Sequence, residues 1–465
     1  MKNQLFQNFP SHSFEQWKQQ VIKDLKGKDF NQALTWMIDE NIKVDCYSDV
    51  TKTLNLPLKT IQQSQFQNIT KSWNNREIIN FNNGKEYNNL IISSLEAGAN
   101  SFMIDYSGVC ESEFEIKKLL RNIKLSDVPF FFKVENNVLN LINELQIIAP
   151  YQWKGGIEDN ILERYFYTGV LDTNGWNNSA NILRKVQKFP NFKSLIISGH
   201  SFHNAGANIG QELAYTLASA IEVIDKISDY EIPLPEIVQK IEFSVSVGTN
   251  YFGEIAKIRA LKFLWKQILK EGYGMQEHEI PAIAVHGISS AFYQSAITPN
   301  TNMLRATTEA MSAIIGGCDA VSIRAFDENY QEDNDFSRRI ARNISTILKE
   351  ESYFDKVIDP SAGSYFIESL TFQLADEALK ILSVVENEGG IIEAFKKNLI
   401  QHSIRQSYEH SKSALVNNDK LMVGVNKFRY DETPFEKPNG EKLIEKPNVG
   451  FELLPNYRLS ETFEQ

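Results

Sequence analysis

The feature that most constrains the fold is an alternation of short apolar runs with longer stretches of helical periodicity, which starts near residue 100. This alternation is typical of βαβ units with parallel strands. Eight strands, each followed by a helix, over roughly 280 residues match an α/β fold of the (β/α)8 TIM barrel type. A doubly wound open sheet is the alternative, because the number of strands does not show closure. The predicted strands are Ser101–Tyr106, Val128–Val134, Gln152–Ile157, Ser194–Ser198, Ile241–Val247, Ala282–Val285, Ala320–Arg324 and Lys356–Ile358.

The chain divides into three predicted parts. Residues 1–75 form an N-terminal arm with a helix around Ser13–Leu25, and the rest of the arm is too polar to build a core of its own. Such an arm needs a surface to lie on, so we expect it to serve in subunit association. The barrel takes residues 76–386. Residues 387–465 contain two helical stretches and a linker-like tail or surface strap with Pro434, Pro438, Pro447 and Pro455.

The composition excludes several classes of protein. With 42% hydrophobic and 23% charged residues, the 465-residue chain has enough apolar sequence for a large core. The net charge of -11 argues against nucleic-acid and anionic-membrane partners, because carboxylates repel phosphates. Cys46, Cys110 and Cys318 form no zinc motif, the N-terminus resembles no signal peptide, and no apolar run reaches the roughly 20 residues of a membrane span. We therefore expect a reduced, cytoplasmic protein without a metal site.

The loops after the predicted strands are the candidates for chemistry, because the active sites of TIM barrels lie at the C-terminal ends of the strands. Gly199–His203 follows the fourth predicted strand and His286–Ser290 the sixth, so both loops are expected at one mouth. Histidine changes charge near neutral pH, which makes His200, His203 and His286 candidate acid or base groups. Histidines that are only satisfied by local hydrogen bonds are an equally open interpretation.

Two further segments have ordinary structural explanations. Asp359–Ser364 ends the last predicted strand and opens a helix, where backbone N–H groups sometimes hold a phosphate. We prefer the interpretation that Ser361 or Ser364 is a helix N-cap. Gly316–Gly317 precedes a predicted strand and is expected to end a helix. Composition, periodicity and spacing alone therefore predict a barrel and leave its function open.

Several blocks of sequence resemble one family. Ile197–Ala207 (ISGHSFHNAGA), followed by Glu212–Ala218, is similar to the ISGYHMQEAGA…AYTLA block of methylmalonyl-CoA mutases. Further similar blocks follow in the family's order, and together they span about residues 73–430. The resemblance implies a TIM barrel in which an acyl-CoA chain threads the barrel axis, beneath an adenosylcobalamin carried by a separate flavodoxin-like domain. The further blocks are Glu254–Ala260, Asp335–Asn343, Asp359–Tyr365 and Val423–Lys427.

The positions that carry the family's chemistry are changed in this chain. By the resemblance, Ile78 stands where the family has the tyrosine that shields the radical. Thr168 replaces the arginine that pairs with the substrate carboxylate, and Ser201 replaces the histidine that binds the thioester carbonyl. Because losing one positioned acid or base typically costs 10²–10⁴-fold in rate, the chain is expected to have no catalytic residues of its own.

Other substrate-site positions are expected to be vestigial. Arg76 keeps the family's arginine, whereas Glu242 places a carboxylate where the family contacts CoA. Glu242, Asp319 and the loss of a cation at Thr168 together predict a channel with added negative charge, which disfavours the phosphates of CoA. The vestigial positions implied by the resemblance are Arg76, Glu158, Lys240, Glu242, His286, Ile288 and Asp319.

The cofactor is expected on another chain. The family's cobalt-ligating histidine lies in a DxHxxG motif, and none of the seven histidines of this chain lies in such a motif. The resemblance therefore implies a barrel without a cobalamin-binding flavodoxin-like domain, namely a non-catalytic small subunit. Its partner would be a large subunit that holds adenosylcobalamin and interconverts (R)-methylmalonyl-CoA and succinyl-CoA. Two alternatives are a barrel subunit of a related acyl-CoA mutase with a separate cobalamin chain, and a non-enzymatic scaffold or regulatory protein.

Overall fold

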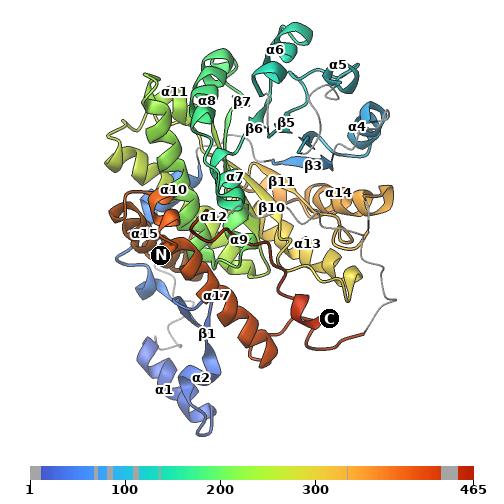
Figure 1. The fold of residues 1–465 in the computed structure, drawn as a ribbon. Helices are drawn as coiled ribbons and strands as arrows, with labels where there is room; N and C mark the ends of the chain where they lie inside the picture. The colour runs from blue at the N-terminus through green and yellow to red at the C-terminus, as the bar shows by residue number, and fades with distance from the viewer. Residues whose placement is uncertain are drawn as a thin grey trace, which may run out of the picture.

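The computed structural model describes residues 12–66, 72–80, 87–107, 115–135, 138–331, 333–430 and 449–464. A parallel sheet lies at its centre, with helices around it (Figure 1). Within these residues the sheet has nine strands in the order β7-β6-β5-β4-β3-β11-β10-β9-β8. The strands are β3 Asn74–Asn80, β4 Ser101–Asp105, β5 Phe130–Lys133, β6 Gly155–Glu158, β7 Phe192–Lys193, β8 Leu195–Ser198, β9 Ile241–Val247, β10 Ala284–Ser289 and β11 Ala320–Ser322.

The two ends of this sheet meet at one residue. Only Ser194 separates β7 from β8, and β7 pairs with β6 while β8 pairs with β9. These two short strands are therefore halves of one barrel strand, and the sheet returns on itself through it. The predicted (β/α)8 TIM barrel is confirmed.

One predicted strand is wrong and one strand was missed. Lys356–Ile358 is no strand, because Phe354–Lys356 forms a 3-10 turn that leads into a loop. The strand that the prediction lacks is β3, at the start of the barrel. Its sequence, NNREIIN, places Arg76 and two asparagines on the same side as Ile78, so it does not stand out as an apolar run. The other seven predicted strands overlap observed strands.

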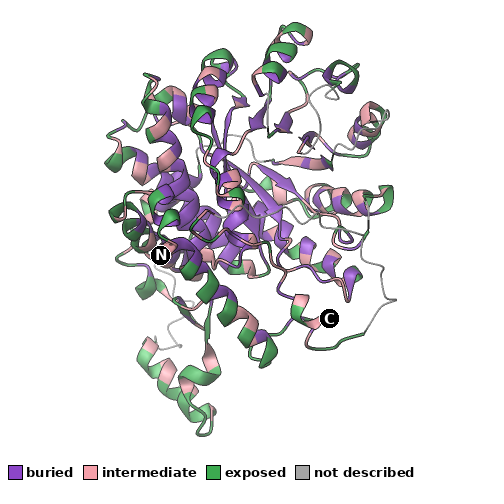
Figure 2. Cartoon of the chain, viewed as in Figure 1, coloured by how far each residue is buried: buried purple, intermediate pink, exposed green. Residues whose placement is uncertain are grey.

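Two barrel helices are buried on every side. Every residue from Gly253 to Lys266 in α12 (Tyr251–Gln267) is buried, and α10 (Ile209–Ser228) is nearly as deeply covered (Figure 2). Burial on every side arises because an outer layer of helices packs over α10 and α12. This layer consists of α3 Leu58–Gln65, α15 Tyr365–Asn387, α16 Ile391–Lys396 and α17 Leu399–Val416.

The remaining helices complete the barrel and its rim. α7 and α9 are short helices at the C-terminal ends of β6 and β8, α14 follows the last strand, and the others lie between successive strands (Figure 1). The predicted caps are confirmed: Ser364 caps α15 by accepting from Ile367 N, and Gly317, with φ +92°, ends α13. These helices are α4 Tyr87–Glu96, α5 Ile116–Leu119, α6 Val138–Ile148, α7 Ile161–Thr168, α8 Thr173–Val186, α9 His200–Asn204, α11 Leu234–Gln239, α13 Pro299–Gly316 and α14 Asp335–Glu350.

The N-terminal segment has one half that lies on the barrel and one that extends away from it. α3 packs on α12, and the Gln65 side chain donates to the backbone oxygen of Arg259 at 3.1 Å. In contrast, α1 (Phe14–Asp24) has no buried residue and projects with α2 (Phe30–Leu34) and the hairpin β1–β2 (Thr35–Met37, Lys43–Asp45), as Figure 1 shows. No helix in the described part of the chain is long and apolar enough to cross a membrane.

A buried ion pair fastens the outer layer to the barrel, and its loss should destabilise the protein. Arg259 of α12 is fully buried and pairs with Asp359 and with Glu368 of α15, and Glu368 also accepts from Gln62 of α3. Arg259→Ala leaves two buried carboxylates without a cation, so we expect a loss of about 3–5 kcal/mol in the free energy of unfolding in urea. The control is Lys380→Ala in the exposed pair with Asp376, which should leave the midpoint unchanged. Equal midpoints for both variants would contradict the assignment.

Candidate functional site

The barrel interior contains a buried ion pair between two of the predicted substrate-site positions. Arg76 of β3 donates from Nη1 to Glu242 Oε1 at 2.7 Å and from Nη2 to Oε2 at 3.1 Å, across the barrel. The two side chains are only 2% and 6% exposed. The guanidinium carbon also lies 3.4 Å from the centre of the Phe131 ring. Arg76 therefore neutralises Glu242, and the expectation that Glu242 makes the channel negative is corrected.

Apolar side chains pack in a cluster of their own inside the barrel. Met103, Phe131 and Ile196 are buried there, and Ile78 packs against them. They come from β3, β4, β5 and β8, at positions whose side chains alternate inward along each strand. Ile78, predicted to replace a catalytic tyrosine, thus serves as a packing residue.

A chain of alternating histidine and serine side chains crosses the interior on the side of β8 to β11. His200 contacts Ser246 Oγ through Nδ1 and Ser244 Oγ through Nε2, both at 2.8 Å. Ser244 continues to His286 Nδ1 at 3.0 Å, and His286 Nε2 reaches Ser322 Oγ at 2.8 Å. Ser322 then donates to the backbone oxygen of Arg76 at 2.7 Å, so the chain ends on the strand of the ion pair.

Both histidines of this hydrogen-bonded series, His200 and His286, are neutral at pH 7. Burial lowers the pKa of His200 to about 3, and the charge of Arg324 adds to the shift. Burial, and after it the charge of Arg76, lowers the pKa of His286 well below its usual value. Every ring nitrogen of His200 and His286 already has a serine partner. We therefore interpret both as histidines satisfied by local hydrogen bonds, and not as acid or base groups.

Charged groups gather at the C-terminal mouth of the barrel. Lys133 Nζ lies 3.5 Å from Asp105 Oδ2, at the ends of β5 and β4. Burial raises the pKa of Glu158, at the end of β6, to about 7, while Lys133 opposes that shift. Burial alone lowers the pKa of Lys133, but the carboxylates of Glu158, Glu163 and Asp105 outweigh it and raise that pKa overall. Among the described residues, the mouth therefore carries charges of both signs.

The other predicted positions do not join one site. Ser201 is fully buried in α9, and its Oγ has no hydrogen-bond partner within the described residues. Thr168 is exposed at the end of α7, where its hydroxyl donates to Arg164 O at 2.7 Å. Lys240 donates to Val186 O at 2.9 Å before β9 starts, and burial lowers its pKa to about 8.

Asp319 lies at the opposite end of the barrel from the mouth. Its Oδ2 accepts from Val285 N at 2.9 Å, just before β11 starts. Ile288, in contrast, follows His286 by two residues on β10 and so shares its inward side. Arg76, Ile78, Glu158, Glu242, His286 and Ile288 thus line the interior, whereas Thr168, Lys240 and Asp319 lie outside it.

His203 belongs to a separate buried network behind the sheet. Its Nδ1 lies 3.3 Å from Glu212 Oε2, and its Nε2 lies 2.7 Å from Ser290 Oγ. Lys257 donates to the same Glu212 oxygen at 2.7 Å and pairs with Glu254. Burial raises the pKa of Glu212, but Lys257 and then His203 outweigh it, and the net shift is downward. His203 therefore joins α9 to α10 and to the loop after β10.

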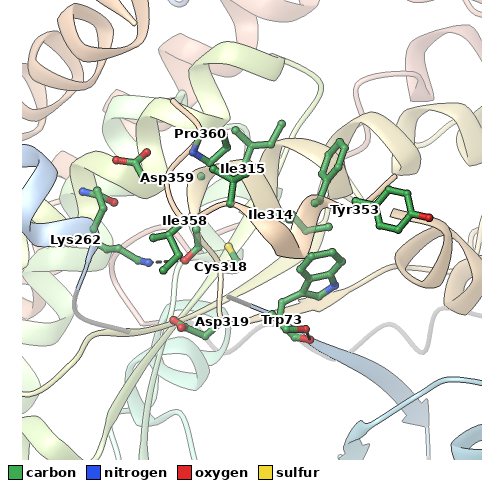
Figure 3. A pocket seen from close by; sticks show the side chains of 16 residues that line it. Trp73, Lys262, Ile314, Ile315, Cys318, Asp319, Tyr353, Ile358, Asp359 and Pro360 are labelled. Atoms are coloured by element: carbon green, nitrogen blue, oxygen red, sulfur yellow. Dashed lines mark hydrogen bonds between the residues drawn. The ribbon is translucent and has the colours of Figure 1, made fainter. Parts of the chain in front are cut away.

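A cavity of about 260 Å³ lies near the N-terminal ends of β3 and β11, away from the mouth (Figure 3). Trp73, Lys262, Cys318 and Tyr353 are among its lining residues. Burial raises the pKa of the Cys318 thiol to about 12, so it is protonated at neutral pH. The cavity shares no lining residue with the ion pair or the histidine chain.

Comparison with known proteins now decides the family. The profile of the family described as "Methylmalonyl-CoA mutase" matches residues 104–447. The chain belongs to the methylmalonyl-CoA mutase family. It is 31% identical over 444 residues to the methylmalonyl-CoA mutase small subunit of Porphyromonas gingivalis, with 92% of this chain and 71% of that protein covered.

Two further family members show how much of a relative this chain spans. The Rhizobium meliloti methylmalonyl-CoA mutase is 35% identical over 363 residues, covering 76% of this chain and 50% of that protein. The Escherichia coli methylmalonyl-CoA mutase is 31% identical over 300 residues, covering 62% and 41%. The alignments thus reach between 41% and 71% of the length of these three mutases.

The described residues do not fit the cobalt site that the resemblance to mutases implies. His200, His203 and His286 each have both ring nitrogens engaged by neighbouring side chains, so none presents a free nitrogen at the mouth. Within the described ranges, no group of three or more histidine, cysteine, aspartate or glutamate side chains is placed to hold a metal ion.

Several interior residues of this mutase-family barrel were missed by sequence reasoning. Phe131, Met103 and Ile196 fill the space, and Ser244 and Ser322 link the histidines. The available signal was the inward alternation along each strand, because Glu242, Ser244 and Ser246 share one side of β9. Which of these side chains pair with one another follows only from the closed barrel.

The ion pair of the interior gives a direct test of its burial. Arg76→Ala and Glu242→Ala each leave a buried charge alone, so each should lower the free energy of unfolding by about 3–5 kcal/mol. The double variant Arg76→Met/Glu242→Met removes both charges at similar volume and should be closer to the wild type than either single variant. Urea unfolding of all four proteins measures this. Single-variant losses below about 1 kcal/mol would mean that the pair is solvated and the interior open.

Proposed function

We propose that this chain is the small, non-catalytic subunit of a heterodimeric, adenosylcobalamin-dependent methylmalonyl-CoA mutase. It would support a large subunit that interconverts (R)-methylmalonyl-CoA and succinyl-CoA. The observation that carries the proposal is the filled interior, in which Arg76, Glu242 and Phe131 occupy the axis along which the resemblance places the acyl-CoA chain. The similarity to a mutase small subunit over 92% of the chain supports the same assignment.

The free energy needed to open the interior argues against substrate binding. An acyl-CoA chain on the axis would have to separate Arg76 from Glu242, and breaking a buried ion pair typically costs about 3–5 kcal/mol. It would also disrupt the hydrogen bonds that join His200, Ser244 and His286, and all three side chains are buried. The side chains of Ile78 and Thr168 carry no charge that could bind the substrate carboxylate and offset this cost.

The partner and the cofactor follow from the same proposal. Relatives of this chain include proteins named methylmalonyl-CoA mutase large subunit, from Streptomyces virginiae and Porphyromonas gingivalis. We infer that such a large subunit is the partner and that it holds adenosylcobalamin, with no cofactor on this chain. We propose a cytoplasmic location, in keeping with the thiols of Cys46 and Cys318, which are unpaired.

The projecting N-terminal part supplies the contact surface in this proposal. Phe14, Trp17 and Tyr47 form a ring cluster, with the Trp17 and Tyr47 centroids 4.9 Å apart, and the Phe30 ring meets Trp17 edge-on at 6.3 Å. Trp36 and Met37 on the hairpin are 45% and 48% exposed. Exposed aromatic and methionine side chains of this kind are enriched in the cores of protein interfaces.

The first test of the proposal is ligand binding by the full chain alone. Calorimetry should show no heat with methylmalonyl-CoA or with adenosylcobalamin, and the chain should have no mutase activity. The triple variant Ile78→Tyr/Thr168→Arg/Ser201→His should stay inactive, because the interior is still filled by Arg76 and Glu242. A catalytic large subunit is the positive control. Micromolar affinity of the wild-type chain for an acyl-CoA would contradict the proposal and favour the alternative of a related mutase barrel.

The second test is association with the large subunit. Deleting residues 1–34 removes α1 and α2, which bury none of their residues, so the unfolding midpoint should not change. Co-purification with a co-expressed large subunit should be lost. The control is Lys380→Ala on α15, far in sequence from the arm and exposed, which should co-purify at full stoichiometry. A truncated chain that still co-purifies would show that the arm is not the contact surface.

A further inference from the structure

The cavity of about 260 Å³ at the N-terminal ends of β3 and β11 lies off the barrel axis (Figure 3). Its wall is built largely from α12, from the end of α13 and from the loop that follows α14. These helices pack on the outer side of the sheet, so the cavity lies between them and the strand ends. Tyr353 and Val357 of the loop line it and are 61% and 59% exposed, so this side of the cavity meets solvent.

Apolar side chains form much of the wall. They include Trp73, Ile314, Phe354 and Ile358. The Trp73 ring is held in place, because its Nε1 donates to Ser345 Oγ at 2.9 Å. A cavity of about 150 Å³ with walls of this kind holds benzene. The larger cavity of this protein therefore has room for a phenyl ring with a short polar group.

Lys262 of α12 is the one cationic side chain among the residues that line the cavity. It is 4% exposed, and within the described residues the only hydrogen-bond partner of its Nζ is the backbone oxygen of Gly317. Figure 3 shows this side chain along one wall of the cavity. An ammonium group has three N–H donors, so the carbonyl satisfies one of them and leaves two without a protein partner among these residues.

The other cations of α12 show what Lys262 lacks. Lys257 and Arg259 each pair with two buried carboxylates, and Lys266 pairs with one carboxylate. Lys262 is buried to a similar degree, but in the described part of the chain it has no carboxylate partner. A buried charge without a counter-charge is costly. The cation that lacks a counter-charge is thus the one that lines a cavity.

Neither carboxylate of the cavity wall neutralises Lys262. Asp359 binds Arg259, and Asp319 Oδ2 accepts from Val285 N at 2.9 Å. The Gly317 carbonyl, at the end of α13, supplies only the partial negative charge of a helix C-terminus. An anion in the cavity would supply the full negative charge and accept the remaining N–H donors.

We propose that this cavity is a binding site for a small carboxylate with an apolar body. The carboxylate accepts hydrogen bonds from Lys262 Nζ, and the body lies against Trp73 and Ile358. The site is separate from the barrel axis and from the projecting arm. This inference therefore goes beyond the proposed subunit role and does not depend on it.

Three probes of one shape test the site by calorimetry on the full chain. Phenylacetate carries a negative charge, phenylacetamide none and phenethylamine a positive charge. Phenylacetate should bind with a dissociation constant of about 1 mM or below, a value within reach of a ligand of this size. Phenylacetamide should bind at least about tenfold more weakly, because hydrogen bonds between two charged groups are the stronger ones. Absence of phenylacetate binding, equal affinity for the amide, or tighter binding of the amine would overturn the proposal.

A substitution of the cation assigns the binding to Lys262. Lys262→Met removes the ammonium at similar length, so it should weaken phenylacetate binding at least about tenfold and leave phenylacetamide binding nearly unchanged. Lys262→Arg keeps the charge and should keep the preference for the acid. The matched control is Lys380→Met in the exposed pair with Asp376, which should bind all three probes as the wild type does.

A second variant keeps the test decisive if Lys262→Met does not fold. Ile358→Trp adds volume to the cavity wall from a half-buried loop position and removes no charge. The variant should stay folded and lose binding of both phenylacetate and phenylacetamide. Wild-type affinity for phenylacetate in folded Ile358→Trp, or in folded Lys262→Met, would place the ligand elsewhere and overturn the assignment.

Discussion

The bidentate ion pair between Arg76 and Glu242 sets the character of the barrel interior. Moving either charge out of water costs several kcal/mol, so each side chain is tolerable there only with the other in place. The Phe131 ring packs against the guanidinium. On the strand beside β3, the Ser322 hydroxyl is hydrogen-bonded to His286 Nε2. Neither charge is available to a ligand, because freeing one of them would leave the other buried without a partner.

The same rule governs the layer outside the barrel. Helix α12 is buried on all sides although it carries lysine and arginine, and each of these has a polar partner, including Gly317 O for Lys262 and Glu277 for Lys266. Lys257 is held by Glu212 and Glu254, and Arg259 by Asp359 and Glu368. The motif around Glu254–Ala260, shared with methylmalonyl-CoA mutases, is therefore explained by the packing of α15 and α3 over the barrel.

The chain thus keeps the barrel of its family and fills the space inside it. Two of the blocks that resemble the family, Glu254–Ala260 and Asp359–Tyr365, meet through the ion pair between Arg259 and Asp359, and this contact is independent of an open axis. The changed positions Ile78 and Thr168 have become a packing residue and a surface residue that hydrogen-bonds its own helix. A fold held from outside in this way does not depend on an open axis, which agrees with the proposed supporting role beside a catalytic partner.

The sequence by itself determined the order of strands and helices, the caps at Ser364 and Gly317, and the family, because periodicity and capping depend on residues a few positions apart. It missed β3, whose polar alternation has no apolar run, and it assigned Glu242 an unbalanced charge. Only the tertiary structure decided that Glu242 meets Arg76, 166 positions away, and that His200 and His286 are joined through Ser244. The physical reason is that the partner of a buried charge or hydrogen-bonding group depends on where the closed barrel places distant strands, and local sequence does not record that placement.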